Sequence, residues 1–390
     1  MIRRADTCAF VPHLSSALVA CALTALTLCG GRLLALHLEE RTIHSTAPRD
    51  FFIKNQGLAF ERAAARTPDI LLLYGSSELT DPIRNRASDF FRKEPTGFEV
   101  CPVGKAGTSS LIILQKLAAL GSDLHGRKLA VSLSASSFLT PGARPEFYAG
   151  NFSLPAACGT LFGNALDLNL KTAIAKRMIQ FPGTLGKDGL LCLAANCLAL
   201  NRPFDRMTLM AMWPLEKLQN IILDLQDHFG ALVYILDRGK PVPDWLRSLG
   251  SHRMQTIKTR PGQSWETWSA NSSDRFHPAR DAEFRARIGA AGEWIDLELL
   301  FRTLTELKAQ PLILSTPIDA FAARGISRSA REVYYNRMRE LAGRYHFPLV
   351  EFEDHDADPN FIIAHREHPT PKGWKDYDQA LDRFFHTKNE

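Results

Sequence analysis

The sequence lacks any concentrated cluster of basic residues, and its 47 Lys and Arg exceed its 42 Asp and Glu by only five. So small an excess gives no reason to expect a nucleic acid as partner, since that binding needs clustered cations. The seven cysteines include no CxxC pair, which argues against a zinc ribbon or a redox dithiol. What the chain does have is 45% hydrophobic and 23% charged residues over 390 positions. This composition predicts a globular protein of about two domains, or one large domain with insertions.

The N-terminal region contains no charged residue between positions 7 and 31. About 20 apolar residues are enough to cross the core of a bilayer, so we predict a transmembrane anchor over residues 11–37. Two arginines precede this run, and the positive-inside rule then places residues 1–10 in the cytoplasm. Residues 38–390 would form an extracytoplasmic domain attached to the cell membrane.

Two other N-terminal processing routes compete with the anchor. A signal peptide could be cleaved, although no clear small-residue cleavage site follows the apolar run. The stretch ending at Cys21 looks like a lipoprotein site, yet the apolar run continues well past that cysteine. The length of the run favours an uncleaved anchor.

Beyond the anchor, short apolar runs alternate with segments of helical periodicity. Such alternation predicts a doubly wound, flavodoxin-like α/β fold, in which helices flank a parallel sheet. Residues 150–300 show helical patterns at Leu166–Ile179 and Pro214–Leu225, so we interpret this stretch as a mostly helical insertion. The predicted strands are Ile70–Tyr74, Phe98–Val103, Lys128–Leu133, Pro311–Ser315 and Leu349–Phe352, and the predicted helices include Leu111–Leu120, Ser327–Tyr345 and Trp374–Phe385.

A serine directly after the first strand has the sequence context of a nucleophile. Ser77 follows Gly75 and Ser76, and a tight turn there would lift its hydroxyl above the edge of the sheet. His368, in a loop before the last helix, could reach this turn and act as its base. Gly107, before another helix, could donate a backbone N–H to an oxyanion. A plain strand-to-helix turn and a surface histidine are the simpler alternatives.

The C-terminal histidines also raise the question of a metal. His355, His365 and His368 lie among aspartates, but their spacing matches no standard metal motif. We therefore predict no metal and no cofactor.

Several further stretches resemble a single family in their order and spacing. The chain is similar to the D-alanyl transfer (DltD) family of the lipoteichoic acid pathway over most of its length. This resemblance implies a fold similar to that of SGNH esterases. The stretches are GSSEL from Gly75, GKAGTSS from Gly104, GNFS from Gly150, NSSDRF from Asn271 and HPTPKGW from His368.

Transferred by motif, the resemblance implies that Ser77 is the nucleophile, His368 the general base and Gly107 an oxyanion donor, with Ser76 beside the substrate. The family pattern has an aspartate three residues before the histidine, but here His365 stands in that position. Ser136 stands where the family has a side-chain amide that would aid the oxyanion. Spacing does not choose among the nearby acids that could orient the histidine, which are Asp354, Asp356, Asp358 and Glu367.

The resemblance implies a membrane-anchored, extracytoplasmic serine acyltransferase. An acyl group, D-alanine in the family, would come from a membrane-bound O-acyltransferase partner (DltB-like) and its acyl carrier pathway. Ser77 would hold it as an ester and pass it to a hydroxyl of an anionic envelope polymer. The alternatives are an esterase or thioesterase of the same fold, and a non-catalytic scaffold subunit whose triad has decayed at His365.

Overall fold

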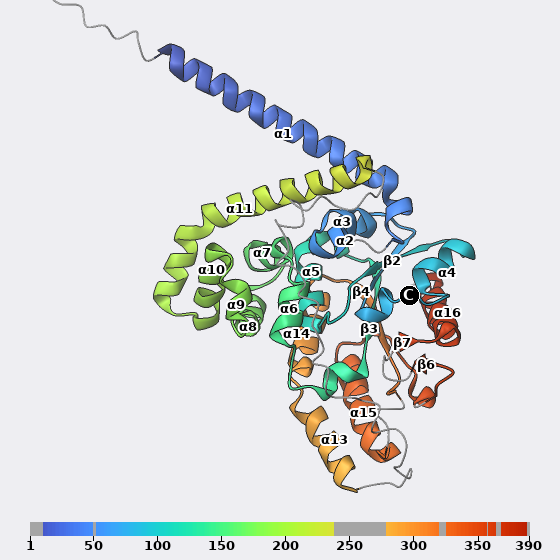
Figure 1. Cartoon of the computed structure of the whole chain (residues 1–390). Helices are drawn as coiled ribbons and strands as arrows, with labels where there is room; N and C mark the ends of the chain where they lie inside the picture. The colour runs from blue at the N-terminus through green and yellow to red at the C-terminus, as the bar shows by residue number, and fades with distance from the viewer. Residues whose placement is uncertain are drawn as a thin grey trace, which may run out of the picture.

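Five parallel strands form the central sheet, in the order β2-β1-β3-β4-β5 (Figure 1). The computed structural model describes residues 11–49, 52–237, 278–319, 325–356, 358–363 and 368–387. The predicted parallel α/β sheet is confirmed, and each predicted strand agrees with the structure to within one residue at either end. The strands are β1 (Ile70–Tyr74), β2 (Glu99–Val103), β3 (Lys128–Leu133), β4 (Gln310–Ser315) and β5 (Leu349–Glu351), with a separate antiparallel pair β6 (Ile362–Ile363) and β7 (His368–Pro369).

The sheet lies between two apolar cores, which explains why its strands are continuous apolar runs. In β1, Leu72 and Tyr74 face the larger core, while Leu71 and Leu73 face the smaller one. Helices α3, α5, α7, α14 and α15 contribute to the larger core, and α4 and α16 to the smaller. Their bounds are α3 (Ala59–Arg66), α4 (Ala87–Lys93), α5 (Ser110–Leu120), α7 (Leu154–Phe162), α14 (Glu293–Glu306), α15 (Arg328–Arg344) and α16 (Pro371–His386).

The described regular structure between β3 and β4 is helical. It includes α8, which covers the predicted Leu166–Ile179 pattern, and α11, which is longer than predicted. A proline favours the first turn of a helix, but Pro214 lies inside α11 and the helix begins at Pro203, where Asp205 and the Arg202 backbone complete a capping box. The elements are η3 (Ala135–Leu139), α6 (Pro145–Asn151), α8 (Leu168–Met178), α9 (Pro182–Leu185), α10 (Gly189–Leu200), α11 (Pro203–Leu236) and α13 (Pro278–Ala290).

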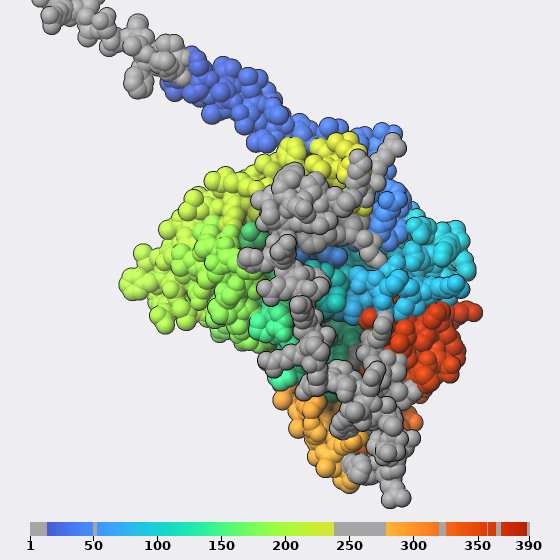
Figure 2. Space-filling view, in the orientation of Figure 1, coloured from blue at the N-terminus to red at the C-terminus, as the bar shows by residue number. Residues whose placement is uncertain are grey.

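The N-terminal helix α1 (Val11–Thr46) is one continuous helix that projects away from the rest of the molecule (Figures 1 and 2). The stretch Leu14–Thr46 is long and apolar enough to cross a membrane. Its C-terminal part continues past the apolar run and packs on the domain, where Ala35 and Ile43 are buried. The remaining short elements are α2 (Phe52–Gln56), η1 (Ser77–Leu79), η2 (Gly121–Leu124) and η5 (Glu353–His355).

Candidate active site

The turn after β1 is held tightly against the turn after β2. Gly104 has a φ of +144°, and a Cβ there would lie 2.0 Å from the carbonyl oxygen of Gly75. The Gly75 N–H also donates to the Val103 carbonyl at 3.1 Å. Only glycine permits this backbone contact. It brings the loop from Gly104 to Thr108 beside the short helix η1, which begins at Ser77.

Ser77 and His368 meet at this edge of the sheet. The Nε2 atom of His368 lies 2.8 Å from the Ser77 Oγ, although 291 positions separate the two residues in the chain. On the other side of the ring, Nδ1 lies 2.7 Å from an Oδ2 of Asp81. When Nδ1 carries the hydrogen and donates it to Asp81, Nε2 is free to accept the serine proton. These three residues therefore have the connectivity of a serine–histidine–acid triad.

His368 is held in place by two local interactions. It belongs to β7, where its partner across the antiparallel pair is Ile363. Two residues later, Thr370 caps α16 by accepting a hydrogen bond from the Gly373 N–H at 3.1 Å. The Thr370 N–H donates to the Phe361 carbonyl at 2.8 Å. The histidine is thus fixed between a strand pair and a capped helix, and both restrict its backbone.

Asp81 comes from the same turn as the nucleophile, not from the C-terminal loop. Its backbone N–H donates to the Ser77 carbonyl at 3.1 Å, which closes one helical turn after the serine. The side chains of Asp81 and His368 are 18% and 11% exposed. This aspartate was not among the acids expected from the sequence. An acid one turn after a candidate nucleophile is the only sequence signal that could have identified it.

The backbone N–H groups of Ser77 and Gly107 have no acceptor within the described part of the chain. Gly107 has a φ of +80°, and a Cβ at that position would lie 2.6 Å from the ring of Phe147. The residue precedes α5, and a helix N-terminus favours negative charge. The local backbone can therefore present unpaired N–H donors to an oxyanion.

Glu78 lies buried beneath this turn. Burial raises the pKa of its carboxyl group, an effect that hydrogen bonding to the Ser76 N–H partly offsets. The Ser76 N–H donates to Oε1 of Glu78 at 2.9 Å. The glutamate folds back over Gly75, where a Cβ would lie 2.3 Å from the same oxygen. The Glu78 side chain therefore stabilises the turn after β1 from its buried side.

Comparison with known proteins places this chain in a family. The family model described as "DltD protein" matches residues 52–386. The chain belongs to the DltD family. Protein DltD of Bacillus subtilis (strain 168) is 23% identical over 348 residues, covering 85% of this chain and 86% of the relative. Protein DltD of Staphylococcus aureus (strain NCTC 8325 / PS 47) is 22% identical over 326 residues, covering 82% and 81%.

Two of the nearby acids that could have replaced the family's aspartate have other partners. Asp356 accepts hydrogen bonds from the Tyr335 hydroxyl and the Ile318 N–H, and pairs with Arg331. Asp358 accepts from the Asn360 N–H at 2.8 Å. Asp81 occupies the position beside His368 Nδ1. The other two acids of this set are Asp354, in η5, and Glu367, which lies outside the described residues, as does His365.

Ser76 and Ser136, the two serines predicted to contact the oxyanion or the substrate, lie on two neighbouring turns. The Ser76 hydroxyl donates to the Lys105 carbonyl at 3.4 Å, which links the turns after β1 and β2. Ser136 lies in η3, after β3, with its Oγ 3.1 Å from that of Ser134. Because β3 pairs with β1, this turn also lies at the carboxyl edge of the sheet.

Proposed function

We propose that this protein is a membrane-anchored serine acyltransferase of the SGNH type. One observation carries the proposal: Ser77 Oγ and Asp81 Oδ2 lie at hydrogen-bond distance from the two nitrogens of His368. A serine hydroxyl is a weak nucleophile until a base takes its proton. Membership of the DltD family supports the same conclusion, because the motif stretches that begin at Gly75, Gly104 and His368 meet here.

In the first half of the reaction, Ser77 attacks the carbonyl carbon of an acyl donor. His368 takes the serine proton at Nε2, and the imidazolium that forms is stabilised by Asp81. The N–H groups of Ser77 and Gly107 stabilise the oxyanion of the tetrahedral intermediate. When the intermediate collapses, His368 gives the proton to the leaving group of the donor. The product is an acyl ester on Ser77.

In the second half, a hydroxyl group of the acceptor attacks this ester. His368 takes the hydroxyl proton, and returns it to the Ser77 oxygen as the ester bond to the enzyme breaks. By resemblance to the DltD family, the acyl group is D-alanine and the acceptor is an anionic polymer of the cell envelope. The donor side would be served by a membrane-bound O-acyltransferase, and α1 would hold the site on the outer face of the membrane.

The esterase or thioesterase alternative differs only in the acceptor, because water can attack the same ester. The scaffold alternative depended on histidine at position 365 in place of the expected acid. Since Asp81 makes the contact that this acid would have made, the sequence difference at 365 is no longer a reason to expect a decayed triad.

The direct test combines the full-length protein in vesicles with a D-alanyl thioester as donor. We expect intact-mass analysis to detect an acyl adduct on the wild type and none on Ser77→Ala. Adding a glycerol phosphate polymer should move the acyl group from the enzyme to polymer hydroxyls. If the adduct forms but the acyl group goes to water whether or not polymer is present, the protein is a hydrolase. If no adduct forms, the scaffold alternative is favoured.

A further inference from the structure

From Leu215 onward, α11 carries an apolar stripe whose first three members the domain leaves exposed. Its members recur at intervals of three and four residues, so they share one face of the helix. Leu215, Leu218 and Ile222 are 57%, 53% and 44% exposed. We define the α11 stripe by five residues: Leu215, Leu218, Ile222, Leu225 and Phe229.

The stripe runs along α11 toward the N-terminal helix and ends against it. A Cβ at Gly31 of α1 would lie 2.9 Å from the ring of Phe229. The two helices are also joined by Arg32 and Asp224 at 2.8 Å. The helix α11 therefore lies next to α1, at the side of the molecule from which α1 leaves (Figures 1 and 2).

The crossing of the two helices has a defined position relative to the apolar run of α1. Gly31 is the last residue of the uncharged stretch, and Arg32 is the first charged residue after it. If α1 spans a bilayer, the hydrocarbon core ends close to this point. The α11 stripe ends at the same level, because its Phe229 contacts Gly31. An apolar helix face at this level lies where interfacial helices bury their side chains among lipid headgroups and upper acyl chains.

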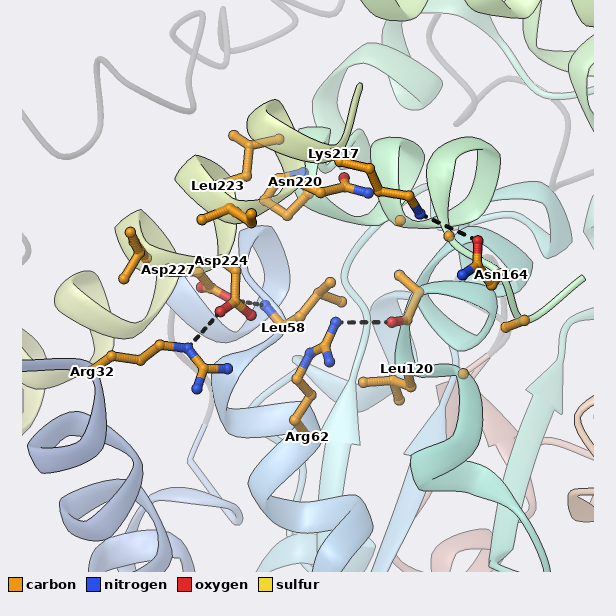
Figure 3. Close-up of a pocket in the computed structure, with 18 of the residues that line it drawn as sticks. Arg32, Leu58, Arg62, Leu120, Asn164, Lys217, Asn220, Leu223, Asp224 and Asp227 are labelled. Atoms are coloured by element: carbon orange, nitrogen blue, oxygen red, sulfur yellow. Dashed lines mark hydrogen bonds and ion pairs between the residues drawn. The ribbon is translucent and has the colours of Figure 1, made fainter. Parts of the chain in front are cut away.

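A pocket of about 940 Å³ opens between α1 and α11 beside the stripe (Figure 3). Part of its wall comes from Leu28 and Cys29 in the apolar run of α1. Arg62 and Lys217 enter it from α3 and α11. The pocket thus offers an apolar wall together with cationic groups, the combination that fits an acyl chain joined to a phosphate.

The residues that line the pocket carry one more positive than negative charge, with Arg32, Arg62 and Lys217 against Asp224 and Asp227. Asp224 is paired with Arg32, and Asp227 accepts from the N–H groups of Leu58 and Ala59 at 2.6 and 2.8 Å. The Lys217 ammonium donates to the Phe162 carbonyl and the Asn164 side chain, and no carboxylate lies within ion-pair distance of it in the described chain. A phosphate is therefore a matching partner for this lysine.

We propose that the α11 stripe and the adjoining pocket form a lipid-binding surface, which holds α11 in the outer headgroup layer of the membrane that α1 crosses. The ligand is a phospholipid, with acyl chains against the stripe and a phosphate near Lys217. The inference rests on the anchoring role proposed for α1. It fixes the distance between the active site and the membrane surface, because the domain contacts the bilayer directly and is not held away from it by α1 alone.

The surface favours lipid over a protein partner for two reasons. It is continuous with the apolar run of α1, which faces lipid in the same proposal. In addition, Trp213 is exposed on α11 with the Lys217 ammonium 5.8 Å from its ring centre, and tryptophan and lysine are typical of the membrane interface. A protein partner remains the outcome to be excluded by the test.

The test uses full-length protein reconstituted alone into vesicles of phosphatidylcholine and phosphatidylglycerol. A fraction of the lipid carries a diazirine on the acyl chain close to the glycerol. After irradiation, mass spectrometry compares labelling of α1 and of α11 in the same molecules. We expect both helices to be labelled in the wild type. The double variant Leu218→Asp/Ile222→Asp should lose about tenfold of the α11 labelling and keep that of α1.

Ile295→Asp is the matched control, because Ile295 is 54% exposed on α14, away from α1 and α11. It should leave both signals at their wild-type values. Labelling of α1 without α11 would overturn the lipid surface and favour a protein partner, while the anchor would stand. Labelling of neither helix would overturn the anchor and this inference together. Labelling of α11 that persists in the double variant would show that the stripe is not the contact.

Discussion

Asp81 and His368 are joined by a hydrogen bond of 2.7 Å across 287 positions of sequence. The acid of the triad therefore comes from the turn that carries the nucleophile, and the base comes from the other end of the chain. Ser77 and Asp81 are fixed to each other by the backbone hydrogen bond between them. The imidazole of His368 is then the only group of the triad that must be positioned separately, and it lies in β7, just before α16.

Replacing Asp81 should slow acylation strongly. Asp81→Asn leaves a side chain of the same shape but removes the negative charge and favours the wrong tautomer of His368. We expect the acylation rate to fall by about 10²–10⁴-fold, measured as the rate of adduct formation on Ser77. Asp354→Asn is the control, because this acid of η5 was an equal candidate by sequence. A variant pattern with Asp354 sensitive and Asp81 silent would contradict the assignment.

Gly107→Ala should weaken oxyanion stabilisation. The φ of +80° is unfavourable for alanine, and the new Cβ would meet the Phe147 ring at 2.6 Å. Displacing the N–H from its position should lower the acylation rate by about 10²–10³-fold. The double variant Gly107→Ala/Phe147→Ala, which removes the clash, should recover part of the rate. If Gly107→Ala acylates at the wild-type rate, this N–H does not serve the oxyanion.

Much of this site could be expected from the sequence, because parallel strands bring their carboxyl ends to one edge of the sheet. This rule predicted that the glycine-bearing turns after β1 and β2 meet, and a late histidine in a loop could be expected to reach them. Asp81 was harder to find, since its only sequence signal is its place one turn after Ser77, and its role depends on the contact with a histidine 287 positions away. The same limit applies to α11, where Pro214 looks like a helix start although the preceding turns are helical.

Glu78 should stabilise the turn after β1 through its hydrogen bond to the Ser76 N–H. Glutamine has nearly the same shape, and its amide oxygen can still accept the Ser76 N–H. We expect Glu78→Gln to keep the wild-type free energy of unfolding to within about 1 kcal/mol. Glu78→Ala should lose about 1–3 kcal/mol, because the Ser76 N–H loses its acceptor. Chemical denaturation of both variants measures this difference, and equal losses would contradict it.

Asp378, on α16, should make the stability depend on pH. Burial, reinforced by the charge of Glu94, raises its pKa to about 9, and neither carboxyl oxygen has a hydrogen-bond partner within the described residues. An acid whose pKa is raised by folding holds its proton in the native state while the unfolded chain loses it. Stability from this group therefore falls as pH rises from about 4 to about 9, by at most about 1.4 kcal/mol per pH unit.

Thermal denaturation between pH 5 and 8 measures this slope. Asp378→Asn should flatten it and raise the midpoint most at pH 8. Asp376→Asn, on the same helix but partly exposed, is the matched control and should leave the slope as in the wild type. An unchanged slope in Asp378→Asn would show that this carboxyl is already ionised in the folded protein.

Covalent labelling of Ser77 tests the central claim most directly. A fluorophosphonate reacts with a serine only when a neighbouring base activates its hydroxyl. We predict that the wild-type, full-length protein gains the mass of one adduct, located by peptide mapping on Ser77, and that His368→Ala and Ser77→Ala gain none. A wild type that stays unmodified, or an adduct that persists after Ser77→Ala, would contradict the account.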